Sequence, residues 1–175
     1  MSTVENKPEL LSKGEASSML PQLVSLLQDA VNGGSSVGFL PPVSADTAET
    51  YWREAIDELT QGNRLLLVAR DAGSVTGTVQ LALAGKQNAP HRAEVQKLLV
   101  HTRFRNRGIA RALMNAAEVA ARDAGRTLLV LDTEQGSAAE QLYVKCGYTR
   151  AGVIPQFALS ADGALITTVV FYKLI

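Results

Sequence analysis

The chain has 175 residues, 46% of them hydrophobic, which is enough for one domain with a sizeable core but not for two. Lys plus Arg total 17 and Asp plus Glu total 17, so the formal net charge is zero, which argues against binding to nucleic acid or to an anionic membrane. The single cysteine, Cys146, excludes an internal disulfide, and no Cys/His spacing indicates a metal site. No segment approaches the roughly 20 apolar residues of a membrane span, and the N-terminus is not a signal peptide, so we expect a cytoplasmic protein.

In chain order, the first part of the chain predicts two helices and then strands. The apolar residues between Leu20 and Val31 recur with the spacing of a helix that has one buried face. Ser44 is a favoured N-cap for a second helix, whose apolar face includes Trp52. We therefore expect flexible residues 1–8, helices over about 18–32 and 46–60, a loop over 35–44, and strands over 64–70, 75–84 and 92–101.

The second part of the chain alternates strands and helices. A long helix is expected to end at Gly125, and a shorter one at Gly147. Between them lies a short, wholly apolar strand that ends on Asp132. The expected elements are helices over about 107–124 and 137–146, and strands over 127–132, 148–153 and 164–174. This order predicts a mixed α/β fold around a single sheet.

A basic turn, Arg105-Asn106-Arg107-Gly108-Ile109-Ala110, connects the strand over 92–101 to the long helix. A helix N-terminus has unpaired N–H groups, and its dipole favours an anion. Gly108 would allow a phosphate to approach the backbone, while Arg103, Arg105, Arg107 and Arg111 could neutralise the remaining charge. The motifs of nucleotide-hydrolysing P-loops and of dinucleotide-binding folds are absent. The pattern favours a diphosphate site over its alternative, a basic helix start on a solvated surface.

Two motifs resemble those of the GCN5-related N-acetyltransferase (GNAT) family. Arg105-x-x-Gly108-x-Ala110 is similar to the family signature Q/R-x-x-G-x-G/A, and Ala139-x-x-Leu142-Tyr143-x-x-x-Gly147-Tyr148 is similar to its A-x-x-L-Y-x-x-x-G-F/Y segment. The resemblance covers most of the chain from about residue 64 onward. It implies an α/β (α+β) GNAT fold, in which helices flank a single mixed, mostly antiparallel sheet that is splayed at the cofactor site. It also implies acetyl-CoA as the cosubstrate and no metal.

The same resemblance implies a set of cofactor-binding residues. Backbone groups of the strand before the basic turn would pair with the pantetheine arm like an added strand. Many family members have an asparagine where this chain has Gly136, so either Ser137 or a backbone group is expected to replace that contact. The implied residues are Leu98, Leu99, Val100, Arg105, Asn106, Arg107, Gly108, Ile109, Ala110, Arg111 and Ser137.

Three side chains are candidates for proton transfer. The acceptor amine must lose a proton and the leaving thiolate must gain one. Glu94 and Asp132 are the candidate bases, acting directly or through water, as the resemblance implies. Glu94 lies on the strand before the basic turn, and Asp132 lies at the C-terminal end of the next strand, where the ligand clefts of open sheets are found. Alternatively, they hold the substrate's ammonium group, Glu94 is an ion-pair partner of its neighbours, or Asp132 caps a turn. Tyr143, with an ordinary pKa of about 10, is the candidate acid, and its alternative is a packing role.

The acceptor is expected to be a small-molecule amine. Within the family, the segments Gly33–Phe39, Arg92–Leu98 and Leu131–Glu134 are similar to the tabtoxin-resistance branch, which acetylates an amino-acid-like β-lactam toxin. Candidate substrate residues are Phe39, Trp52 and Glu134, although the two aromatic residues also fit the core.

Other functions and assemblies remain as alternatives. One alternative is that the acceptor is a protein or peptide amine. Another is that the chain is a CoA-binding regulatory module without catalysis. No nucleic-acid or membrane partner is expected. The C-terminal segment 165–174 either pairs within the chain or adds to the sheet of a second copy in a homodimer.

Overall fold

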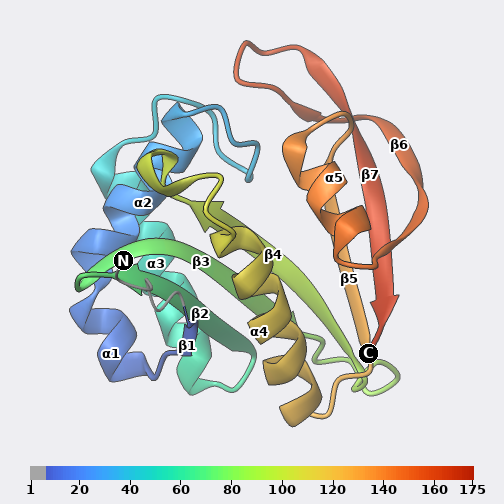
Figure 1. The fold of residues 1–175 in the computed structure, drawn as a ribbon, viewed down its shortest axis with the longest axis horizontal. Coiled ribbons are helices and arrows are strands. Elements are labelled where there is room, and N and C mark those ends of the chain that lie inside the picture. Colours follow the sequence, from blue (N-terminus) through green and yellow to red (C-terminus); the bar gives the residue numbers. More distant parts are fainter. Residues whose placement is uncertain (1–6) are drawn as a thin grey trace.

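The computed structural model describes residues 7–175, so most of the N-terminus that was expected to be flexible lies outside the described residues. Seven strands form one sheet in the order β1-β2-β3-β4-β5-β7-β6 (Figure 1). The strands are β1 Glu9–Leu10, β2 Arg64–Asp71, β3 Ser74–Leu83, β4 Arg92–Val100, β5 Leu128–Glu134, β6 Thr149–Leu159 and β7 Leu165–Leu174. The helices are α1 Lys13–Ser18, α2 Leu20–Asn32, α3 Ala45–Thr60, α4 Ile109–Asp123 and α5 Ala138–Lys145, with a short 3-10 helix, η1, at Thr102–Phe104.

The sheet is mixed and mostly antiparallel, as expected. Only the pairing of β4 with β5 is parallel among the described strands. The C-terminal strand β7 lies between β5 and β6 of the same chain, which is the internal alternative for this segment. No helix within residues 7–175 is both long and apolar enough to cross a membrane.

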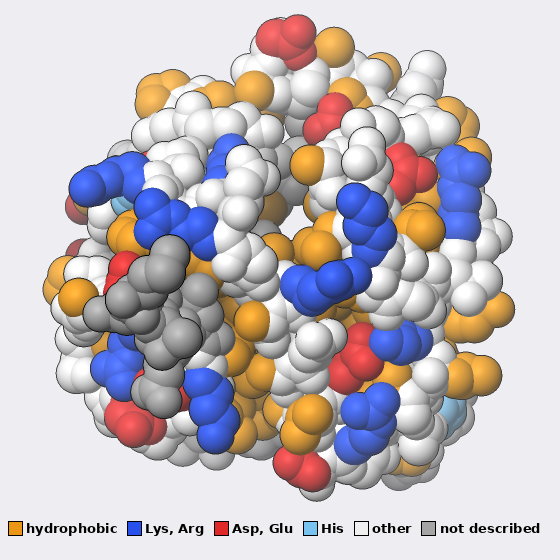
Figure 2. Space-filling view, viewed as in Figure 1, with side chains coloured by type: hydrophobic (Ala, Val, Ile, Leu, Met, Phe, Trp, Pro, Cys, Tyr) orange, Lys and Arg blue, Asp and Glu red, His pale blue; other side chains and the backbone are white. Residues whose placement is uncertain are grey.

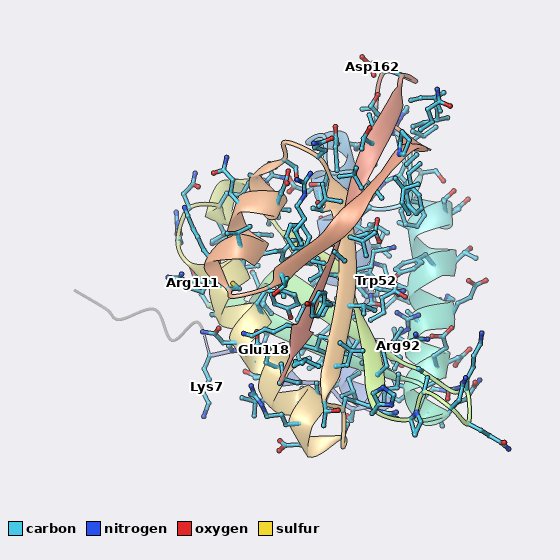
Figure 3. All side chains as sticks on the ribbon, turned by 90° about the vertical axis from the view of Figure 1, so that its right-hand side faces the viewer. Lys7, Trp52, Arg92, Arg111, Glu118 and Asp162 are labelled. Atoms are coloured by element: carbon cyan, nitrogen blue, oxygen red, sulfur yellow. The ribbon has the colours of Figure 1, made fainter. Side chains whose placement is uncertain are left out.

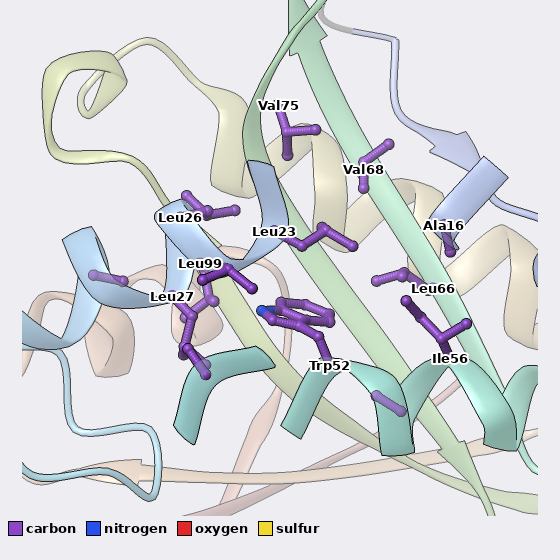
Figure 4. Close-up of a cluster of buried hydrophobic side chains, with 14 of the residues drawn as sticks. Ala16, Leu23, Leu26, Leu27, Trp52, Ile56, Leu66, Val68, Val75 and Leu99 are labelled. Carbon is purple, nitrogen blue, oxygen red and sulfur yellow. The ribbon is translucent and has the colours of Figure 1, made fainter. Parts of the chain in front are cut away.

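Helices cover both faces of the sheet. Helices α2 and α3 pack on one face, and α4 and α5 pack on the other, as the side view in Figure 3 shows. Trp52 of α3 is fully buried at the centre of the first cluster, against Leu23 and Leu66 (Figure 4). Removing a buried aromatic ring of this size costs about 3–5 kcal/mol. The N-cap prediction for α3 is confirmed, because Ser44 Oγ accepts from the Thr47 N–H at 3.1 Å.

The two halves of the sheet separate along β4 and β5. These strands pair only where Arg92 to Glu94 face Leu128 to Val130. From Val95 onward, β4 has no β5 partner in the described chain, and Figure 1 shows the two strands diverging. The splay implied by the family resemblance is therefore confirmed, and it leaves backbone groups of β4 facing a gap.

Three features differ from the expectation. The sequence reading missed β1 and α1, although Ser12 and Glu15 form a capping box at the start of α1. Strand β6 continues to Leu159 instead of ending at residue 153. Its pairing with β7 changes register between Ile154 and Ala158, the stretch that contains Pro155, which has no N–H to donate to the ladder. Its position at the edge of the sheet makes that irregularity tolerable.

Candidate functional site

A cleft of about 820 Å³ lies where β4 and β5 diverge. Its walls are the second half of β4, the turn before α4, the end of β5, helix α5 and the loop over residues 33–38. Figure 2 shows a hollow near the middle of this face, with Lys and Arg side chains around it. The cleft is large enough for a cofactor and a small second molecule.

The basic turn places an open helix N-terminus in this cleft. Gly108 is the N-cap of α4 with a φ of 80°, and no side chain caps the helix. A Cβ added at Gly108 would meet no other heavy atom within 4 Å, so the space beside this backbone is open. Asn106 also has a positive φ, 63°, which turns the chain sharply before the helix. The unpaired amides and the helix dipole fit a diphosphate.

The arginines around the turn do not all face the cleft. Arg105 lines it, but its guanidinium donates to Ser35 Oγ and to the Val100 carbonyl, both at 3.4 Å. Arg111 also lines the cleft and donates to the Lys145 carbonyl at 3.3 Å, which ties α4 to α5. The Arg107 guanidinium instead lies 5.2 Å from the centre of the Phe104 ring. The cleft therefore offers an anion more backbone amides, and fewer arginine charges, than the sequence suggested.

The other expected cofactor residues are divided between cleft and core. Leu98, Val100, Ile109 and Ala110 line the cleft. The Leu99 side chain is only 1% exposed and packs in the Trp52 cluster, so any contact of Leu99 with a cofactor would involve its backbone.

Ser137 begins a second helix at the cleft. It is the N-cap of α5, and its Oγ accepts from the Glu140 N–H at 3.2 Å. The Glu140 carboxylate accepts from the Gly136 N–H at 2.6 Å, which orders the turn before the helix. Ser137 therefore lines the cleft through a structured turn, and its contact with a cofactor stays a prediction.

Glu94 and Asp132 lie on one face of the sheet, on either side of the gap. Glu94 is in register with Val130, and Asp132 is two residues further along β5, so both side chains point the same way. Asp132 accepts a hydrogen bond from Thr168 Oγ1 at 3.0 Å. Within residues 7–175 neither carboxylate has a cationic partner within 4 Å, so the ion-pair alternative for Glu94 is not observed. Both carboxylates line the cleft.

Tyr143 reaches the cleft from the opposite face of the sheet. It lies on α5, is 7% exposed, and packs 6.0 Å from the Tyr148 ring and 6.1 Å from the Phe171 ring. Burial raises the pKa of its phenol well above the ordinary value, and the Asp132 carboxylate acts in the same direction. The hydroxyl is therefore protonated at neutral pH and can donate a proton.

The expected substrate residues do not come together. Glu134 lines the cleft, whereas Trp52 is fully buried in the core, so its ring cannot contact an acceptor there. Phe39 packs edge-to-face on Tyr51 with ring centres 5.4 Å apart and is partly buried against the core. The periodic position of Trp52 on α3 indicated a core residue, and the structure places it in the core.

Two residues of the site were not recognised from the sequence. Asp29 at the end of α2 accepts from the Thr102 N–H and from Thr102 Oγ1, both at 2.7 Å, and so holds the segment before the basic turn. No local pattern reveals a contact between residues 73 apart. Lys97 lines the cleft from β4, a strand that also carries Arg92 and Glu94, so its charge alone did not distinguish it. Residues 7–175 contain no cluster of His, Cys, Asp or Glu that could hold a metal ion.

Comparisons with known proteins agree with this geometry. Residues 34–148 match the acetyltransferase (GNAT) family. An uncharacterized N-acetyltransferase of Azospirillum brasilense, from the hisH-hisA intergenic region, is 31% identical over 118 residues, which cover 66% of this chain and 68% of that protein. The ribosomal-protein-alanine N-acetyltransferase of Brucella melitensis has a similar structure, with a TM-score of 0.79 at 20% identity, covering 96% of this chain and 99% of that one. The structure of yncA from Salmonella typhimurium with its cofactor acetyl-CoA has a TM-score of 0.77 at 18% identity, covering 99% and 94%.

Proposed function

Because the chain belongs to the acetyltransferase (GNAT) family and is therefore an acetyl-CoA-dependent N-acetyltransferase, we propose that it acetylates the primary amine of a small, amino-acid-like molecule. The observation that carries this proposal is the cleft at the β4–β5 gap. The uncapped start of α4 and Tyr143 line it from one face of the sheet, and two carboxylates without an ion-pair partner in the described chain line it from the other. The similarity to the tabtoxin-resistance branch supports an acceptor of this class, such as a toxin or an antibiotic.

The residues of the cleft fit acetyl-CoA. The amides at Gly108, Ile109 and Ala110 would hold the diphosphate, and the unpaired edge of β4 near Leu98 and Val100 would pair with the pantetheine arm. When bound, acetyl-CoA supplies the acetyl group as a thioester. The open space beside Gly108 is the feature that makes a close approach of phosphate to backbone feasible.

Glu94 and Asp132 would attract and deprotonate the acceptor. An alkyl ammonium with a pKa of about 10 is charged at neutral pH and is not nucleophilic. Two carboxylates on the same face of the sheet draw this cation into the gap, and one of them takes its proton, directly or through a water. Asp132 is held by Thr168, which makes it the better oriented of the two.

Tyr143 would donate the opposite proton. Its raised pKa keeps the hydroxyl protonated at neutral pH, so it can donate a hydrogen bond to the sulfur as negative charge develops there. A thiolate, with a reference pKa of about 8.5, needs only modest assistance to leave. We therefore expect Tyr143 to accelerate the reaction without being indispensable.

The test is thiol release from acetyl-CoA with a panel of amino acids, simple amines and peptides, with the product identified by mass spectrometry. The proposal predicts turnover of small amines that falls in the Tyr143→Phe variant. Turnover of peptides alone would instead identify a protein acetyltransferase. Cofactor binding without turnover of any amine would indicate a CoA-binding regulatory module.

A further inference from the structure

Lys97 occupies an irregular position in β4. Thr78 pairs with Leu99 and Gln80 pairs with Gln96, so Lys97 and Leu98 together face the single residue between Thr78 and Gln80. This bulge gives Lys97 a φ of 48°, a left-handed conformation that is unfavourable for a residue with a side chain. Such a conformation persists only where the surrounding structure imposes it.

The bulge redirects the Lys97 side chain. Strict alternation along β4 would point consecutive side chains to opposite faces. Instead, Gln96 and Lys97 both lie on the α3 face: Gln96 accepts from Arg64 at 3.0 Å, and Lys97 Nζ lies over the rings of Phe39 and Tyr51. This is also the face to which Glu94 points, so the bulge adds a cation to the acceptor side of the cleft.

The surroundings of the ammonium group are fixed. Nζ lies 5.7 Å from the centre of the Phe39 ring and 5.1 Å from that of Tyr51. The Tyr51 hydroxyl donates to Gln80 Oε1 at 3.0 Å, and the same oxygen accepts from Arg64. Arg64 is in turn paired with Glu58 of α3 at 2.6 Å. The Tyr51 ring is thus held through Gln80 and Arg64 and cannot easily move away from Lys97.

The Lys97 charge has no ion-pair partner in the described chain. Within residues 7–175 no carboxylate lies within 4 Å of Nζ. Burial lowers the pKa of Lys97, the Arg64 charge lowers it further, and the Glu94 and Asp132 carboxylates act in the opposite direction. The two rings provide part of the missing stabilisation through cation–π contacts. A half-buried ammonium that has lost water and has no ion-pair partner in the described chain would be stabilised by a bound anion.

We propose that Lys97 binds the carboxylate of the acceptor and selects amines that also carry an anionic group. This inference rests on the proposed function, because it concerns the same cleft and the same acceptor. Glu94 and Asp132 would hold the ammonium end of an amino acid, and Lys97 the carboxylate end. The opposite charges within one cleft match a zwitterion, whereas a simple amine would leave Lys97 unpaired and the carboxyl group's place empty.

The experiment compares acceptors that differ only in charge. Each amino acid of a panel is paired with its carboxamide, for example alanine with alaninamide, and kcat/KM is measured for the wild type, Lys97→Met, Lys97→Arg and Lys86→Met. Methionine keeps the length and most of the packing of lysine but has no charge. Exposed Lys86 serves as the matched control. Comparing the same pair of acceptors between two proteins cancels the intrinsic reactivity of each amine.

We expect the preference for acid over amide to fall about 10- to 100-fold in Lys97→Met, as for the loss of a charge-assisted hydrogen bond. The preference should persist in Lys86→Met and should be partly retained in Lys97→Arg. A fall in kcat/KM that is equal for acids and amides would show a structural role and would overturn the proposal. If Lys97→Met does not fold, the uncharged but polar variant Lys97→Gln takes its place in the same comparison; an acid-to-amide ratio equal to that of the wild type would refute the proposal.

Failure of the proposed function gives a different result. If small amines are acetylated but the acid-to-amide ratio is the same in the wild type and in Lys97→Met, Lys97 does not select carboxylates, while small-molecule acetylation stands. If no small amine is acetylated, the proposed function fails. Calorimetric binding of alanine and alaninamide to the CoA-bound protein then decides on Lys97 separately: equal affinities would refute its role.

Discussion

Replacing Gly108 with alanine tests the anion site, and the structure separates two effects of this change. The φ of 80° costs any residue with a Cβ about 1–2 kcal/mol, because the left-handed region is unfavourable for L-residues. The new Cβ meets nothing in the protein within 4 Å, so packing adds no further cost. It would, however, project beside the amides proposed to hold the diphosphate.

Gly125 provides a matched control at the other end of α4. It has a φ of 72° and also has nothing within 4 Å of an added Cβ. Gly108→Ala and Gly125→Ala should therefore lose similar stability. For a chain of this length, about 1–2 kcal/mol corresponds to a fall in Tm of roughly 2–8 °C.

The two variants should differ in their use of the cofactor. Loss of a backbone hydrogen bond to a charged group costs about 1.5–3 kcal/mol, which is about a 10- to 100-fold change in affinity. We expect the KM for acetyl-CoA to rise by that factor in Gly108→Ala, with little change in the KM for the amine, and to stay constant in Gly125→Ala. Initial rates at varied acetyl-CoA give these constants. Equal cofactor KM values in both variants would refute the placement of the diphosphate at this turn.

Other variants test the remaining parts of the site. Tyr143→Phe should lower kcat by about 10- to 100-fold with small changes in either KM, and an unchanged kcat would remove it as the proton donor. Asp132→Asn should lower kcat/KM for the amine more than Glu94→Gln, because Thr168 orients Asp132; steady-state rates with both variants decide the order. Gly77→Ala places a Cβ 2.8 Å from the Leu99 carbonyl oxygen and should cost about 1–3 kcal/mol in a denaturant melt. Because burial lowers the pKa of Lys97, its charge is lost at a lower pH than that of an exposed lysine. As the pH is raised, the KM of a carboxylated acceptor should therefore begin to rise at that lower pH; KM measured against pH for the acid, in the wild type and in Lys97→Met, checks the direction.

Local patterns predicted the helices and most strands well. Each expected helix is present because caps such as Ser44 and glycines such as Gly125 act on their own neighbours. The continuation of β6 past Pro155 was not predictable in the same way. It depends on β6 being an edge strand, and edge position is a property of the assembled sheet.

The residues of the candidate site were likewise predicted where local patterns suffice and missed where their position depends on the assembled fold. The basic turn, Glu94, Asp132 and Tyr143 were identified from motifs and the ends of strands, and the structure brings them to one cleft. Lys97 was missed because its orientation depends on a bulge defined by pairing with β3, which periodicity cannot reveal. Asp29 was missed because its partner is remote in sequence. Trp52 was offered as a substrate residue because a buried and a cleft-facing aromatic have the same helical spacing.

The cleft between β4 and β5 is proposed to bind acetyl-CoA on one side and an amine on the other, and a crystal structure with coenzyme A and an amino acid would show both. We expect diphosphate oxygens about 3 Å from the amides at Gly108 and Ala110, with the cofactor sulfur beside Tyr143 and the amine facing Glu94 and Asp132. A diphosphate bound away from the start of α4, or an amine on the far side of the sheet from both carboxylates, would refute the proposed site.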